Sequence, residues 1–141
     1  MDSGVRNILS NKIAFGFLPI LAITTALAQN FAYTGLVANW IAPTTGIYTI
    51  TAFGAQGGGS YGGSGGLGAE MGGYFSLTAG DVLIIVVGGQ GGNGEFFQNY
   101  GGGGGGGSFV YTTANLPLVI AGGGGGAAEN STDGLGNGGN G

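Results

Sequence analysis

Residues 82–92 read VLIIVVGGQGG, an apolar run that passes directly into glycine. The same design stands one period earlier, where residues 48–58 read YTITAFGAQGG, and one period later, where residues 116–126 read LPLVIAGGGGG. Self-similarity at a fixed period indicates one supersecondary unit that is used several times. The sequence therefore predicts three repeats of equal length, at residues 40–73, 74–107 and 108–141.

Each repeat predicts a β-hairpin followed by a glycine-rich loop. In the first repeat Tyr48, Ile50 and Ala52 alternate with threonines, which is typical of a half-buried strand. The continuous apolar run at residues 82–87 suits a strand that is covered on both faces. Pro117 cannot donate to a sheet ladder, so it places the third such strand at an edge or at its own start. With a further strand at residues 31–37, about seven strands suffice for a pair of packed sheets.

The glycine-rich loops are residues 54–73, 88–107 and 122–141, and they are equal in length. A hairpin begins and ends on the same side, so we expect all three loops to leave from one end of the sheets. Seven consecutive glycines at residues 101–107 and five at 122–126 can adopt the extended threefold polyproline-II conformation. Packed side by side, such segments would hydrogen-bond to one another. The alternative is a flexible glycine–serine linker.

Residues 1–28 resemble a secretory signal peptide. Arg6 and Lys12 form a basic region, an apolar stretch follows at residues 13–23, and a small-residue cleavage site precedes Gln29. The alternative is a membrane anchor, but a stretch of this length is shorter than the roughly 20 residues that a spanning helix needs. We therefore expect a secreted or cell-surface protein whose mature part, residues 29–141, is a piece of a longer chain.

Charge excludes several partners for the mature part. Arg6 and Lys12 are the chain's two cationic residues, and the chain has no histidine, so residues 29–141 carry no cation. Binding to nucleic acid or to an anionic membrane surface requires cations and is therefore excluded. Glycine-rich motifs in this chain lack the lysine of a phosphate-binding loop.

The same composition argues against catalysis. Without cysteine or histidine the chain has no thiol nucleophile, no catalytic triad and no conventional zinc site. The mature part holds five scattered carboxylates, for which we predict a solubilising role. Glu129, Asn130 and Asp133 leave open the alternative of a hard-cation site. We predict no enzymatic activity, no metal and no cofactor. The five carboxylates are Glu70, Asp81, Glu95, Glu129 and Asp133.

Four aromatic residues lie in the glycine-rich loops, outside the predicted hairpins: Tyr61, Phe96, Phe97 and Tyr100. One interpretation is that they cover the ends of the hairpins. The other is a contact surface for a protein or a surface glycan, because exposed aromatic side chains favour interfaces. These four residues are the candidate partner site.

Several stretches resemble the glycine-rich domain of the ectodomains of anaplastic lymphoma kinase and leukocyte tyrosine kinase, and related microbial secreted proteins. They cover nearly all of the mature part and are residues 31–35, 40–43, 45–48, 52–58, 83–91 and 118–124. The resemblance implies a jelly-roll-like β-sandwich that carries polyglycine-II helices. Its shared residues, such as Trp40, Pro43 and Tyr48, are scaffold positions, so no ligand-contacting residue follows from it.

The sequence thus predicts an all-β fold: a jelly-roll-like β-sandwich of repeated hairpins with glycine-rich loops packed as polyglycine-II helices. The expected function is that of a secreted, non-enzymatic structural or adhesion module. The alternative is a ligand-binding ectodomain fragment of a receptor tyrosine kinase-like protein. The absence of cations and the flat glycine surfaces also favour self-association, without placing an interface.

Overall fold

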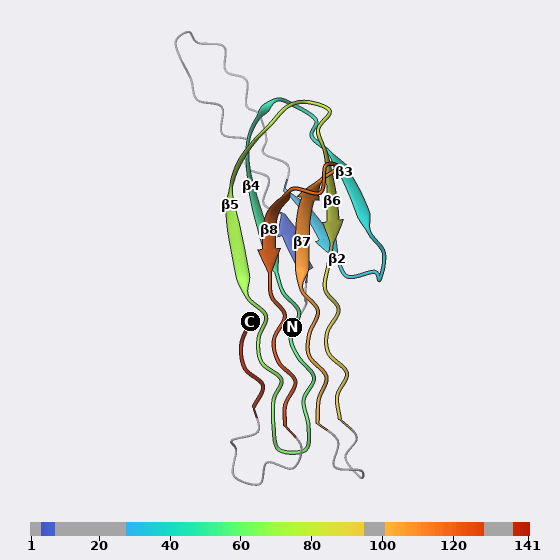
Figure 1. The fold of residues 1–141 in the computed structure, drawn as a ribbon, viewed down its shortest axis with the longest axis vertical. Coiled ribbons are helices and arrows are strands. Elements are labelled where there is room, and N and C mark those ends of the chain that lie inside the picture. Colours follow the sequence, from blue (N-terminus) through green and yellow to red (C-terminus); the bar gives the residue numbers. More distant parts are fainter. Residues whose placement is uncertain (1–3, 8–27, 95–100, 129–136) are drawn as a thin grey trace.

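The computed structural model of the chain describes residues 4–7, 28–94, 101–128 and 137–141 (Figure 1). In these residues the secondary structure is entirely β, and all strand pairs are antiparallel, so the prediction of an all-β fold is confirmed. The strands are β1 (Gly4–Asn7), β2 (Gln29–Ala32), β3 (Ala38–Ile41), β4 (Gly46–Phe53), β5 (Glu70–Leu77), β6 (Val82–Val86), β7 (Ser108–Thr112) and β8 (Pro117–Ala121).

Hydrogen bonding groups these strands into three sheets. Four strands form one sheet in the order β3-β6-β7-β8, β4 pairs with β5, and β1 pairs with β2. Strand β1 also lies against β4, so it stands between β2 and β4. Pro117 begins β8, which is an edge strand of the four-stranded sheet, as its missing N–H predicts.

One hydrophobic core joins the four-stranded sheet to β4 and β5. Tyr48, Ile50 and Ala52 of β4 are almost completely buried, which confirms the alternation expected there. They face Leu83 and Ile85 of β6 and further side chains from β3, β7 and β8. The rings of Trp40 and Tyr48 meet edge to face at 5.4 Å, a favourable arrangement for aromatic pairs.

Strand β6 is less enclosed than its sequence predicts. Leu83 and Ile85 are fully buried, but Val82, Ile84 and Val86 on the other face are only half-buried. The β-branched run therefore reflects a central position, with β3 on one side and β7 on the other, rather than layers on both faces. The same face continues across β7 and β8, where Phe109 and Ile120 lie opposite each other and are exposed.

The prediction of a hairpin within every repeat is wrong for the first two repeats. Strand β3 pairs with β6 rather than with β4, and β5 pairs with β4 rather than with β6. The tight turns after β3 and β5 instead carry the chain from one sheet to the other. Only β7 and β8 pair as predicted. Alternation identifies a strand but not its partner, and here the partner of β4 is the strand that follows the glycine-rich loop.

Strand β1 lies inside the predicted signal peptide. Its four residues pair with residues 29–32, in register from Gly4 opposite Ala32 to Asn7 opposite Gln29. The apolar stretch at residues 13–23 and, of the cleavage site, Ala26 and Leu27 fall outside the described residues. Within the part of the chain that the structure describes, no helix is long and apolar enough to cross a membrane.

Candidate functional site

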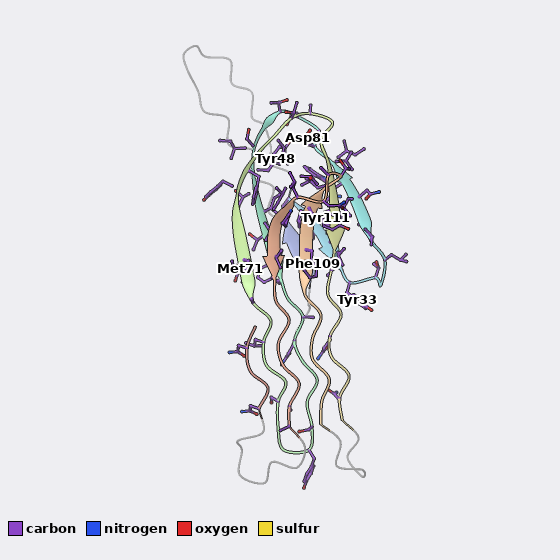
Figure 2. All side chains as sticks on the ribbon, viewed as in Figure 1. Tyr33, Tyr48, Met71, Asp81, Phe109 and Tyr111 are labelled. Atoms are coloured by element: carbon purple, nitrogen blue, oxygen red, sulfur yellow. The ribbon has the colours of Figure 1, made fainter. Side chains whose placement is uncertain are left out.

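Below the sheets in Figure 1, extended glycine-rich segments run side by side from one end of the strands. We number them in chain order: segment I (residues 54–59), II (63–69), III (88–94), IV (101–107), V (122–127) and VI (137–141). Segments I, III and V continue β4, β6 and β8, and segments II and IV lead into β5 and β7. Figure 2 shows that side chains crowd around the strands and are few on these segments.

Backbone hydrogen bonds tie the six segments together. Segments I and V are central, because each bonds to four others, and segment I shows the pattern. The bonds run from Gly57 N to Gly66 O (2.9 Å, segment II), Gly58 N to Gly103 O (2.7 Å, IV), Gly91 N to Gln56 O (2.9 Å, III) and Gly124 N to Ala55 O (2.9 Å, V). Segment VI joins at the side, where Gly125 N donates to Gly139 O at 2.7 Å.

These bonds recur at every third residue. Ala55 and Gly58 both donate to segment IV, at Gly106 and Gly103. Between segments IV and V the same step appears, since Gly102 donates to Ala127 and Gly105 to Gly124. Each segment thus directs successive N–H and C=O groups toward different neighbours. A β-strand, with its two-residue period, bonds only to the two sides in its own sheet.

Close approach of the backbones explains the glycine content. A Cβ atom at Gly57 would lie 2.0 Å from Gly125 O, and one at Gly105 would lie 2.1 Å from Ala55 O. Both neighbours are backbone carbonyls, which cannot move aside without disturbing the hydrogen bonds between segments. Side chains are consequently excluded from the interior of this arrangement, with the small buried residues Ala55 and Ala127 as exceptions.

Three asparagine side chains accept hydrogen bonds from backbone N–H groups that have no backbone carbonyl as partner. These asparagines were not identified from the sequence. Asn93 Oδ1 accepts from Gly59 N at 2.8 Å. Asn137 and Asn140 accept from Ser64 N and Leu67 N, both at 2.9 Å. The available signal was the three-residue spacing of Asn137 and Asn140 and the glycines beside each asparagine.

A buried serine marks the junction between strand and glycine segment. Ser108, the first residue of β7, has no exposed surface, and its Oγ accepts a hydrogen bond from Gly88 N at 3.0 Å. This bond gives the N–H of Gly88, the first residue of segment III after β6, an acceptor that no backbone carbonyl supplies. Ser108 is the one buried polar side chain among the described residues.

The far end of the segments, which we call the tip, contains the candidate residue Tyr61. Ser60 and Gly63 exchange backbone hydrogen bonds across a tight turn in which Gly62 has a φ of 86°, a conformation that favours glycine. Tyr61 projects from this turn and is 52% exposed. It borders an open pocket that is also lined by Asn93 and by residues 59, 60, 62 and 94.

The tip gathers parts of all three glycine-rich loops. Gly94 N donates to Gly59 O at 2.9 Å, and Ser60 Oγ donates to Ala128 O at 2.6 Å. The turn that bears Tyr61 is therefore fixed to the segments that enter the other two loops. The other candidate contact residues, Phe96, Phe97 and Tyr100, lie outside the described residues, as do Glu95, Glu129 and Asp133.

The two described carboxylates of residues 29–141 belong to the strands and turns. Glu70 is exposed at the start of β5. Asp81 is exposed in the turn before β6, where its Oδ2 accepts from Thr78 N at 2.8 Å and so fixes the turn. The described part of the chain contains no group of three carboxylate, histidine or cysteine side chains that could hold a metal ion. Comparison with known proteins finds no matching protein-family model and no matching curated protein.

Proposed function

We propose that this protein is a secreted, non-enzymatic structural or adhesion module that holds a contact site at the end of a rigid glycine stalk. In this proposal the sheets form a jelly-roll-like β-sandwich, segments I–VI are polyglycine-II helices, and the tip is the contact site. Its partner is a protein or a surface glycan. The chain acts at the cell surface or outside the cell, after removal of residues 1–28.

One observation carries the proposal: the backbone hydrogen bonds between segments repeat every three residues and run in several directions from each segment. Polyproline-II-type helices have three residues per turn and leave their N–H and C=O groups free for neighbours. A flexible linker would not place bonds such as Ala55 N to Gly106 O and Gly58 N to Gly103 O in register. This regular bonding favours a stiff element over a tether.

The tip suits a contact role because it combines an exposed aromatic ring with a fixed backbone. The ring of Tyr61 offers a large contact area with little side-chain entropy to lose. The turn beneath it is held by the bonds from Ser60 to Gly63 and to Ala128. The cation-free mature chain favours a partner recognised through aromatic and hydrogen-bonding contacts rather than through anionic groups.

Amide hydrogen exchange tests the stalk. In the secreted protein we expect slow exchange for Gly58, Gly103 and Gly105, whose N–H groups donate to other segments. Uniformly fast exchange at these glycines, with protected amides in β6, would mean flexible loops on a small β domain and would refute the stalk.

Adhesion tests the contact site. Beads coated with the secreted protein should attach to a cell monolayer, and substitution of Tyr61, Phe96, Phe97 and Tyr100 by alanine should abolish most of this attachment. The matched control is Tyr74→Ala, since Tyr74 is an exposed aromatic residue on β5, away from the tip. Equal loss in both variants, or no loss in either, would refute a contact role for these four residues. Tight binding of one soluble protein ligand with the same dependence on the tip would favour the receptor-type alternative.

A further inference from the structure

One side of segments IV and V carries no side chain. It is formed by Gly101 and Gly104, which are exposed, and by Gly123 and Gly126, which are half-exposed. We call these four residues the glycine face. Segments IV and V are bonded to each other and both are bonded to segment I, so the glycine face lies on the side turned away from segment I.

The glycine face contains unused donors and acceptors. Four glycines of segment IV donate to neighbouring segments: Gly102 and Gly105 to segment V, Gly103 and Gly106 to segment III. Among the described residues, the N–H and C=O groups of Gly104, Gly123 and Gly126 make no backbone hydrogen bond. These groups recur at the same three-residue spacing as the bonds inside the stalk. An array of unpaired backbone groups is a template for pairing with another chain, as in an edge β-strand.

The opposite side of the stalk differs. There the outward positions of segments I, II and III bear side chains, such as Gln56, Leu67 and Gln90, of which Leu67 is 48% exposed. These side chains would hold a second backbone too far away for direct N–H to C=O bonds. Among the described residues, only the glycine face is thus bare, which favours a closed pair over an open stack.

We propose that the glycine face binds the glycine face of a second copy of this chain, giving a two-fold symmetric dimer held by backbone hydrogen bonds. Donors and acceptors share the same face, so the face can be complementary to itself after a two-fold rotation. Segments I–VI contain no charged side chain, so two copies of a net-negative chain can approach here without direct charge repulsion. The inference rests on the proposed polyglycine stalk. It assigns the self-association that the composition favours to one interface, the glycine face.

Sedimentation velocity of the secreted protein, over a wide concentration range, tests the dimer. We expect the wild-type protein to dimerise and Gly104→Ala to weaken dimerisation by about tenfold or more, because a methyl group on a flat backbone face separates the two copies. Within one molecule this change is tolerated, since the nearest atom to a Cβ at Gly104 is Gly124 O at 3.7 Å, an ordinary contact. The matched control is Gly92→Ala on segment III, where a Cβ meets nothing within 4 Å.

Exchange of the Gly123 and Gly126 amides gives an independent readout. In the dimer these amides should become protected as the protein concentration rises, whereas those of Gly58 and Gly105 should be protected at every concentration. A monomer with protected Gly58 and Gly105 would overturn the dimer and leave the stalk intact. Fast exchange at Gly58 and Gly105 would overturn both proposals. A dimer that persists unchanged in Gly104→Ala, with unprotected Gly123 and Gly126, would overturn the placement of the interface.

Discussion

Gly105 illustrates how one residue type produces this architecture. Its N–H donates to Gly124 O at 2.8 Å, and its Cα lies so close to segment I that a Cβ would meet Ala55 O at 2.1 Å. A Cβ at Gly92, in segment III, would have no atom within 4 Å. Identical residues in the same kind of segment therefore have opposite tolerance to substitution, and their position relative to neighbouring segments decides it.

The substitution Gly105→Ala should lower the free energy of unfolding by about 1–3 kcal/mol, because the backbone of segment I must shift to admit a methyl group. Gly92→Ala should instead be neutral or stabilising by up to about 1 kcal/mol, since alanine restricts the unfolded chain. Urea denaturation monitored by circular dichroism measures both. Equal effects of the two changes would contradict the packing of segments I and IV.

Asn140 supplies an acceptor rather than a donor to Leu67 N. Asn140→Ala should therefore destabilise the protein by about 0.5–1.5 kcal/mol, whereas Asn140→Asp, which keeps the oxygen, should cost much less. Thermal unfolding of the two variants beside the wild type distinguishes them. If the aspartate variant were as unstable as the alanine variant, the side-chain amide N–H₂ rather than Oδ1 would be the group that matters.

At the scale of strands, the sequence was sufficient to predict where strands form but not which strands pair with each other. The runs at residues 48–52 and 82–86 were recognisable because apolar and β-branched residues in short runs predict strands. The sheet partner of β4 was not recognisable, because β4 pairs with β5, and residues 54–69 separate these two strands in the sequence. Strands β4 and β5 and segments I and II therefore form one long hairpin. Its turn is the one that bears Tyr61, at the tip of the glycine-rich segments. Local turn chemistry near Gly80 gave no sign that the chain there changes sheets.

Ser108 connects the strands to the stalk, and its removal tests that connection. In Ser108→Ala the N–H of Gly88 loses its acceptor in a buried place, so we expect a loss of about 1–3 kcal/mol of stability. Ser76→Ala on β5, at an exposed position, is the control and should change stability by no more than about 0.5 kcal/mol. Chemical denaturation gives both values, and equal midpoints for the two variants would show that the bond to Gly88 contributes nothing.

For the molecule as a whole, the proposed removal of residues 1–28 would break the pairing of β1 with β2. Strand β1 belongs to the segment that a signal peptidase would remove, whereas β2 begins at Gln29, the first residue after the predicted cleavage site. The hydrogen bonds between them can exist only in the unprocessed chain. Sequence reasoning placed the cleavage site from its small residues but gave no reason to expect structure before it.

Intact-mass measurement of the secreted protein should give a chain that begins at Gln29. In that chain the amides of β2 should exchange faster than those of β6, because β2 has lost β1 while β6 keeps β3 and β7 as neighbours. A secreted chain that retains residues 4–7, with protected β2 amides, would contradict the expected processing. The unprocessed chain, produced without export, serves as the reference for protection of β2.

The direction of the hydrogen bonds between segments has a mechanical consequence. Segments I–VI run along the long axis of the molecule, and their N–H···O=C bonds run across it (Figure 1). A force between the tip and the sheets would load these bonds in shear, so that several must break together rather than one after another. Segments built almost without side chains would then resist pulling along their length and yield far more easily when they are peeled apart sideways.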